Sequence, residues 1–173
     1  MEAERLIEAG RRALADSADV PAVMAEAWQA QVLARAVGGH LARCGPADVR
    51  TEAGELSDTG APGGPVSEHP VVAGGVRASQ LTAVTDVAAA LAALAHYLGE
   101  VGIALVGVAC GTDEEGLYWQ CIEAIDAADE SVDRVHGMLR RLAEHERERD
   151  PGGERDGPYG VIRGPADPVG GRP

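Results

Sequence analysis

The amino-acid sequence predicts an all-α protein: an antiparallel helical bundle built on a long αα-hairpin, with a flexible loop and a disordered C-terminal tail. The hairpin is indicated by two long segments in which apolar residues and glycines recur every three or four positions, the spacing of one helical face. The segments meet at Gly111-Thr112, and two helices joined by so short a turn run antiparallel. The two series are Leu81, Val84, Ala88, Leu91, Ala95, Leu98, Gly102, Leu105 and Ala109, and then Tyr118, Cys121, Ile125, Ala128, Val132, Val135, Leu139 and Leu142.

Two helices are expected before the hairpin. The first spans residues 3–16, where apolar side chains and Gly10 share one face. The second spans residues 21–44, with a seam of small apolar residues at the same spacing. Asp19 or a neighbour can cap its start, and Pro21 suits the first turn because no hydrogen bond is lost there. Gly45-Pro46 is expected to end it.

A short helix and a long connection are expected next. Val49, Ala53 and Leu56 are in phase for one apolar helical face. Residues 57–76 are rich in Gly and Pro and carry few large apolar groups, so they predict a flexible loop. The loop is either disordered or folded over the bundle through Val66, Val71 and Val72. In both cases it lets the chain recross from the second helix to the start of the hairpin.

The first hairpin helix is expected from Ala78 to Gly111, and it is apolar on more than one face. A second row of apolar residues at seven-residue spacing predicts contact with two neighbours, as in the central helix of a bundle. Glycine in a helix interior costs roughly 1 kcal/mol relative to alanine. We therefore expect a neighbouring backbone to approach closely at Gly99, Gly102 and Gly107. The second row comprises Val87, Leu94, Val101 and Val108.

The second hairpin helix is expected to begin with a capping box and to end near Arg147. Thr112 is the predicted cap, and Glu115 lies three residues further on. Beyond Asp150 the chain is rich in Gly and Pro and has no periodicity, so residues 150–173 predict a disordered tail. The predicted organisation is one helical domain, residues 1–149, containing the loop 57–76.

The composition excludes several classes of partner. The formal net charge is -13 at pH 7, from 28 acidic side chains against 15 Lys and Arg. Nucleic acids and anionic membranes attract positively charged surfaces, so neither is expected to bind. Lys, Asn and Phe, which have A/T-rich codons, are absent. Arginine usage therefore indicates a GC-rich genome rather than selected anion recognition.

One segment, Val87 to Cys110, is long and apolar enough to be considered as a membrane span. It is flanked by Asp86 and Asp113, and no Arg lies between Arg77 and Arg134, so it lacks the positive-inside signal. The three cysteines are too few for a disulfide framework and suit a reducing compartment. The N-terminal segment lacks the charge order of a signal peptide. We expect a cytoplasmic protein without membrane association.

A family resemblance is carried by residues 99–142, which read GEVGIALVGVACGTDEEGLYWQCIEAIDAADESVDRVHGMLRRL, with the opening EAERLIEA and the run EAWQAQ. These segments resemble an uncharacterised domain family of Streptomyces and related actinobacteria. The similarity covers the helical body and not the tail. It implies a small cytoplasmic helical protein with no assigned activity, and it supplies no functional residues.

Acidic side chains on the second hairpin helix raise the question of a metal site. Glu123, Asp126, Glu130 and Asp133, with His136, have a spacing like that of carboxylate-bridged metal bundles. These acids fall opposite the apolar seam, and the Glu-x-x-His pair that such bundles use is absent from the sequence. We therefore expect a solvated acidic face, with no metal, cofactor or catalytic residue.

Cys110 is the candidate reactive thiol, because it precedes the positive end of the next helix. Asp113, Glu114 and Glu115 oppose that effect, so its reactivity stays open. Cys121, on the helix seam, is expected to be a small buried hydrophobe.

Tryptophan offers the other candidate site. Trp28-Gln29 and Trp119-Gln120 have the same local sequence, and Trp in an alanine-rich core usually serves packing. The alternative is a ligand pocket lined by Trp28 and Trp119 near Gly102.

Two functions are compatible with these patterns. The first is a non-catalytic helical protein that acts through protein contacts, with a partner or as a homodimer, because the apolar rows exceed the number of helices available to cover them. The second is a small-molecule-binding or regulatory bundle with its pocket near Trp28 and Trp119. An exposed apolar strip favours the first function, and an enclosed pocket with inward polar groups favours the second.

Overall fold

A computed structural model describes residues 1–59 and 75–149, and it confirms the all-α class for those residues. The predicted loop 57–76 lies mostly outside the described residues, and the predicted tail lies wholly outside them. The described helices are α1 (Ala3–Ala15), α2 (Val20–Cys44), the short 3₁₀ helix η1 (Ala47–Val49), α3 (Arg50–Asp58), the 3₁₀ helix η3 (Arg77–Gln80), α4 (Val87–Gly111) and α5 (Glu115–Arg149).

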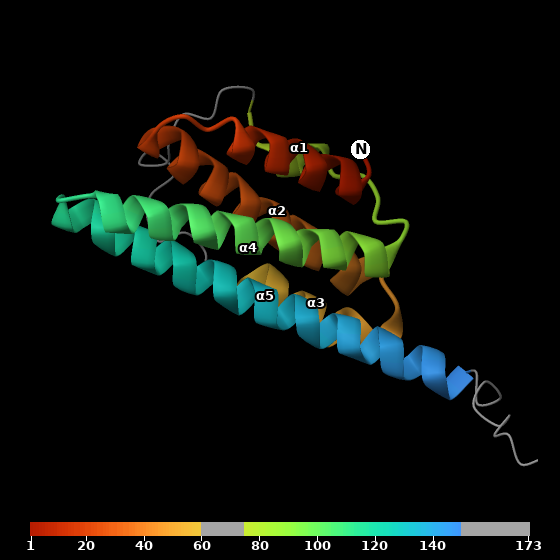
Figure 1. The fold of residues 1–173 in the computed structure, drawn as a ribbon. Helices are drawn as coiled ribbons and strands as arrows, with labels where there is room; N and C mark the ends of the chain where they lie inside the picture. Colours follow the sequence, from red (N-terminus) through yellow and green to blue (C-terminus); the bar gives the residue numbers. More distant parts are fainter. Residues whose placement is uncertain (60–74, 150–173) are drawn as a thin grey trace, which may run out of the picture.

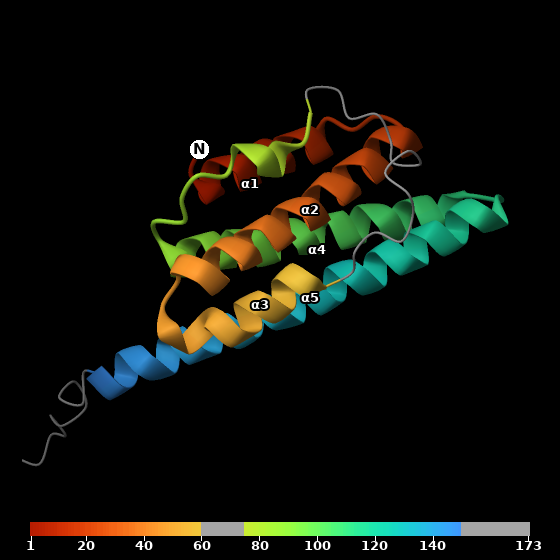
Figure 2. The same cartoon turned by 180° about the vertical axis from the view of Figure 1, so that it is seen from behind.

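The helices pack as a bundle around the predicted hairpin. α4 and α5 run antiparallel along almost the whole length of the molecule, joined at one end by a short turn (Figure 1). α1 and α2 cover one side of α4, and α3 packs beside the second half of α5, as the reverse view shows (Figure 2). α4 contacts α1, α2 and α5, as its several apolar rows predict. The helix with the most neighbours is nevertheless α2, which contacts α1, α3, α4 and α5, so the expectation that α4 is the central helix is wrong.

The interior is built from the residues that the periodicity predicted. Ala and Val occupy many interior positions, so neighbouring helices lie close together. Predicted interior positions with at most 1% exposure are Ala30, Ala34, Val37, Leu41, Val49, Ala53, Leu56, Leu91, Leu98, Leu105, Cys121 and Val135. Tyr118, predicted on the α5 seam, is instead 41% exposed.

Helix α2 begins as predicted. The Asp19 carboxylate accepts a hydrogen bond from the Ala22 N–H at 2.9 Å, and Pro21 lies in the first turn. Gly45 follows its last residue, and the Gly45 N–H donates to the Leu41 carbonyl at 2.8 Å. Asp and Pro at these positions leave fewer backbone groups without a partner.

The predicted start of α4 at Ala78 is wrong, because the helix begins at Val87. Asp86 caps it, with its carboxylate accepting from the Ala89 N–H at 2.9 Å. The residues before Asp86 pair with the N-terminus: the Thr82 N–H donates to the Met1 carbonyl, and the Ala3 N–H donates to the Ala83 carbonyl, each at 3.0 Å. These bonds use backbone groups that a helix from Ala78 would need.

The predicted capping box at the start of α5 does not form. The helix begins at Glu115, and the Thr112 hydroxyl accepts a hydrogen bond from the Glu114 N–H at 3.1 Å. A threonine hydroxyl bonded two residues ahead makes a turn rather than a helix cap. Thr112 therefore shapes the connection between α4 and α5 without capping α5.

The expected close backbone approach at Gly99, Gly102 and Gly107 is also wrong. A Cβ added at any of them would meet no neighbouring atom within 4 Å. Close approaches occur instead at Gly10, where a Cβ would lie 2.6 Å from the Tyr97 hydroxyl oxygen, and at Gly38, where it would lie 2.8 Å from the Ala53 carbonyl oxygen. α4 buries a narrower face than its apolar pattern suggests, and its glycines fall outside that face.

Ion pairs join α3 and η1 to the second half of α5. Each pairs a carboxylate from residues 48–55 with a basic side chain of α5, and each is partly exposed, so each contributes little individually. The pairs are Glu55–Arg134, Glu52–Arg141 and Asp48–His145.

Candidate functional site

The outward face of α4 is an apolar feature that the described helices leave uncovered. We define it by the exposed residues of α4, all of which point away from α1, α2 and α5. It carries no Asp, Glu, Lys or Arg over a helix of 25 residues, which is about 37 Å long at 1.5 Å per residue. Its members are Ala88, Ala89, Ala92, His96, Gly99, Ile103, Val106, Gly107, Cys110 and Gly111.

Large apolar side chains project from the second half of this face. Ile103 is 75% exposed and Val106 is 48% exposed. A surface helix ordinarily places charged or polar residues on its solvent side. In proteins generally, exposed apolar patches mark sites of contact with another protein, a membrane or a ligand.

Two aromatic side chains lie just beyond the turn, at the start of α5. Tyr118 is 41% exposed and Trp119 is 55% exposed. Their rings meet edge to face, with centroids 5.4 Å apart and planes 80° apart. Tyr and Trp are enriched in protein interfaces because each combines a large apolar ring with a polar group.

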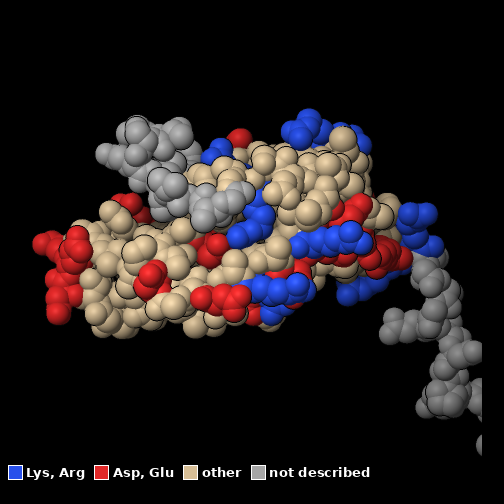
Figure 3. All heavy atoms as spheres, turned by 90° about the horizontal axis from the view of Figure 1, so that it is seen from above, with Lys and Arg blue, Asp and Glu red and all other residues tan. Residues whose placement is uncertain are grey.

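One end of the outward face is acidic. Seen from above, acidic side chains gather at the end of the molecule where α4 meets α5 (Figure 3). Asp113, Glu114 and Glu115 are exposed there, at the negative end of the α4 dipole. Any molecule that covers the outward face therefore meets an apolar surface with an acidic end.

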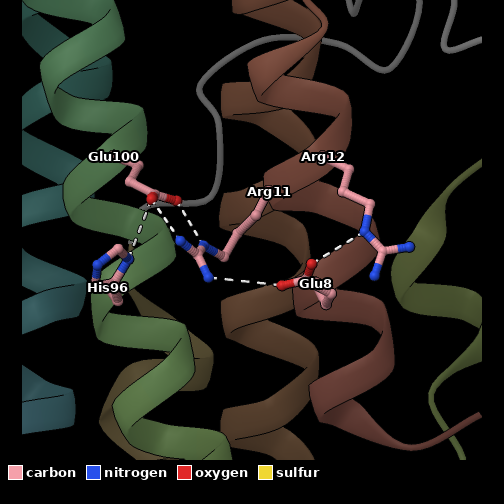
Figure 4. A network of polar contacts seen from close by, with 5 residues as sticks. All are labelled: Glu8, Arg11, Arg12, His96 and Glu100. Atoms are coloured by element: carbon pink, nitrogen blue, oxygen red, sulfur yellow. Dashed lines mark hydrogen bonds and ion pairs between the residues drawn. The ribbon is translucent and has the colours of Figure 1, made fainter.

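A polar network borders this face on the side of α1 (Figure 4). The Arg11 guanidinium donates two hydrogen bonds of 2.7 Å to the Glu100 carboxylate, joining α1 to α4. His96 Nδ1 lies 3.3 Å from the same carboxylate, and Glu8 pairs with both Arg11 and Arg12. The bonds from Arg11 lower the pKa of Glu100.

An open groove of about 420 Å³ lies beside this network, between α1 and α4. Its polar lining consists of Glu8, Arg11, Arg12 and Glu100, which already pair with one another. Its apolar lining includes Ile103, so the groove is continuous with the outward face. The network joins two helices and limits the outward face along one edge.

A second polar cluster lies inside the molecule and holds the segment before η3. Arg77 donates two hydrogen bonds to Glu26, at 2.8 and 2.9 Å, and both side chains are mostly buried. Gln29 Nε2 donates to the Gly75 carbonyl at 2.8 Å, and its Oε1 accepts from the Arg77 N–H at 2.9 Å. Tyr97 is fully buried close to this ion pair, and its burial raises the pKa of its hydroxyl.

A third feature is a groove of about 390 Å³ along α2, with Arg35, His40 and Arg43 in its lining. Arg35 Nε donates to the Ser57 carbonyl at 3.0 Å and so ties α2 to α3. His40 and Arg43 lie near the C-terminal end of α2, where basic side chains complement the helix dipole. These roles support the bundle and do not require a ligand.

The residues predicted to line a ligand pocket lie in different surroundings. Trp28 is half-buried on α2, Trp119 is exposed on α5, and Gly102 is half-buried on α4 with open space beside it. Neither groove described above is lined by any of them.

The two cysteines considered as thiol candidates differ in burial, and the acidic side chains of α5 are exposed. Cys110 is exposed on the outward face, and Cys121 is buried with its sulfur 3.8 Å from the Met24 sulfur. Burial raises the pKa of Cys121, which makes it a poor nucleophile. Glu123, Asp126, Glu130 and Asp133 are all exposed, as predicted for a solvated acidic face.

By length and composition, α4 could also cross a membrane. It has a mean hydropathy of 1.7 over its most apolar stretch, of which 33% is buried inside the described part of the molecule. A core helix of a soluble protein has the same composition, so this finding alone does not separate the two environments.

Ile103 and Val106 were not singled out by the sequence pattern, although a signal existed. The periodicity showed more apolar rows on this helix than its neighbours could cover. The two apolar rows identified from the sequence are largely buried. Ile103 and Val106 belong to a further row, which lies between them in sequence and is exposed. Only the positions of α1, α2 and α5 around α4 identify which row is left uncovered.

Comparisons with known proteins place the chain in a family without assigning it an activity. No curated protein matches the sequence, and no solved structure matches the fold. The model of a family of unknown function, DUF6099, matches residues 1–141, most of the helical body. The chain therefore belongs to the family of unknown function DUF6099.

Proposed function

We propose that this protein acts without catalysis, through protein contacts made by the outward face of α4, and that it associates with itself through this face. The observation that carries the proposal is that the exposed residues of this 25-residue helix include no Asp, Glu, Lys or Arg. Ile103 and Val106 supply the exposed branched side chains that apolar interfaces bury.

The described polar clusters support a structural role rather than a catalytic one. Arg11 with Glu100, and Arg77 with Glu26, are bidentate ion pairs that each join elements far apart in the sequence. In each pair, the guanidinium and the carboxylate bond to each other. Such pairs position helices, and they leave the apolar face as the surface available for binding.

The charge distribution favours a protein partner over a lipid surface. The formal net charge is -13, and α4 is flanked by Asp86 at one end and by Asp113, Glu114 and Glu115 at the other. Anionic lipids repel such flanks. We propose a cytoplasmic location, supported by the exposed free thiols of Cys44 and Cys110, and a source among Streptomyces and related actinobacteria, supported by the GC-rich residue usage.

Light scattering on the purified chain and on two valine variants tests the proposal. The unmodified chain is expected to have the mass of two chains of 17.8 kDa. Val106→Glu, on the outward face, is expected to give the mass of one chain, because a buried carboxylate without a partner opposes association. Val20→Glu is the matched control, since Val20 is 37% exposed at the start of α2 and far from this face in sequence.

Thermal melting of the same samples separates loss of association from loss of folding. Both variants are expected to remain helical, because both positions are substantially exposed. A single-chain mass for the unmodified protein at every concentration would contradict the proposal. So would a dimer that Val106→Glu leaves intact.

A further inference from the structure

We infer that the occupant of the outward face is a second copy of this chain, with the two α4 helices packed antiparallel about a two-fold axis at Gly99. This arrangement rests on the proposed self-association and adds a direction and a register. Gly99 is the middle residue of Val87–Gly111, so full overlap of two antiparallel helices places Gly99 beside Gly99. A symmetric pair of this kind uses the same surface on both copies.

The size pattern of the face is self-complementary in this register. Val106 faces Ala92 of the second copy, which lies on the same face. Ile103 faces Ala95 and His96 faces Gly102, two half-buried residues at the edge of the outward face, so each large side chain meets a small residue. Ala and Gly dominate one half of the face, whereas Ile103 and Val106 occupy the other. Large residues opposite small ones fill an interface without voids or clashes.

The arrangement also accounts for the glycines of α4. A Cβ at Gly99 or Gly102 would meet no atom of this chain within 4 Å, so packing within one copy does not require glycine at either position. Glycine nevertheless weakens a helix interior. Close approach of a second helix gives both residues a role, because small residues allow two helix backbones to come together.

Charge favours the antiparallel pair over the parallel one. A parallel pair would bring two copies of Asp113, Glu114 and Glu115 together at the negative ends of two helix dipoles. An antiparallel pair separates these acidic ends by the length of α4, about 37 Å, well beyond the screening length of about 8 Å at physiological salt. It brings each acidic end beside Asp86 of the second copy, one carboxylate instead of three. A parallel pair would also oppose Ile103 to Ile103 and Val106 to Val106, so that large side chains meet large ones.

Disulfide cross-linking of the full chain reads the direction of the pair. In Cys44→Ser/Cys110→Ser, the substitution Gly99→Cys places one thiol of each copy at the axis, and rapid oxidation to a covalent dimer is expected. In Cys44→Ser alone, the Cys110 thiols lie about 33 Å apart at 1.5 Å per residue, so no cross-link is expected. Cys121 is buried and does not interfere.

Cross-linking through Cys110 without cross-linking through Gly99→Cys would overturn the antiparallel arrangement. Light scattering on the same samples keeps the two proposals distinguishable. A dimer with the Cys110 cross-link contradicts only the arrangement, whereas a single-chain mass contradicts the proposed self-association as well.

A leucine substitution at Gly102 provides a second test that does not depend on thiols. Gly102→Leu is expected to stabilise the isolated chain, because space is open and leucine favours helix, yet to raise the dissociation constant at least tenfold by occupying the place of His96 from the second copy. Gly54→Leu is the matched control, since Gly54 also has open space but lies on α3. An unchanged dissociation constant for Gly102→Leu would overturn the register.

Discussion

Tyr97 is a large polar side chain with no exposed surface, and it fits the interior because residue 10 is glycine. A Cβ at Gly10 would lie 2.6 Å from both Cζ and Oη of the Tyr97 ring. Because the Tyr97 ring is fully buried, moving it aside would cost free energy of folding. The pair thereby fixes the distance between α1 and α4.

Gly10→Ala is therefore expected to lower the free energy of unfolding, although alanine is the better helix former. Overpacking costs about 1–3 kcal/mol, against a propensity gain of about 1 kcal/mol. Urea unfolding measures the balance. Gly54→Ala, in open space, is the control and is expected to be neutral or stabilising. Equal changes in unfolding free energy for Gly10→Ala and Gly54→Ala would show that the Tyr97 ring does not restrict the size of the side chain at position 10.

At the scale of the helix, the side-chain hydrogen bonds that precede α4 and α5 have different roles. Asp86 bonds an N–H of α4 itself, whereas Thr112 bonds the Glu114 N–H before α5 begins. Only the first bond satisfies a helical donor that has no other partner.

We expect Asp86→Ala to cost about 1 kcal/mol of unfolding free energy and Thr112→Ala to cost less. Asp19→Ala, which removes the equivalent cap of α2, supplies the calibration. Chemical denaturation of the three variants under one condition measures the loss of unfolding free energy in each and so ranks them. A larger loss for Thr112→Ala than for Asp86→Ala would mean that α5 begins earlier in solution.

Helix existence was predictable from the sequence, whereas helix ends and faces were predictable only in part. Seven-residue and three-four periodicity located the four long helices, because burying an apolar stripe is what stabilises a helix in a bundle. The start of α4 was not predictable, because the backbone of residues 82–83 bonds to the N-terminus, more than 70 residues away. The uncovered face of α4 was missed for a related reason: an apolar helix gives no local sign of which row its neighbours cover.

The salt bridge between Arg11 and Glu100 gives the whole molecule an acid-sensitive contact between α1 and α4. The pKa of Glu100 is lowered, first by its hydrogen bonds from Arg11 and further by the nearby charge of Arg11 and by His96. A carboxyl group with a lowered folded-state pKa stabilises the protein at pH values above its unfolded pKa. That contribution is lost as pH falls through the folded-state value.

Unfolding free energy is therefore expected to fall below about pH 4.3, the ordinary glutamate value, with Glu100 contributing to the slope. Glu100→Gln removes the titrating group and is expected to flatten this part of the pH profile. Glu148→Gln, at the exposed end of α5, is the control for removing one negative charge. Parallel profiles for Glu100→Gln and the unmodified chain would show that this contact does not couple folding to pH.

The molecule as a whole combines a strongly acidic surface with one long uncharged helix face. Like charge keeps copies of such a protein apart, so association requires a surface from which charge is absent. The outward face of α4 is such a surface, and Ile103 and Val106 lie on it. Self-association through this face is the central claim, and it predicts that mass depends on protein concentration and on the integrity of that face.

Sedimentation equilibrium of the unmodified full chain over a hundredfold dilution tests this claim most directly. The expected result is the mass of two 17.8 kDa chains at high concentration, moving toward one chain on dilution. The mass of one chain at every concentration, in dilute and in physiological salt, would contradict it.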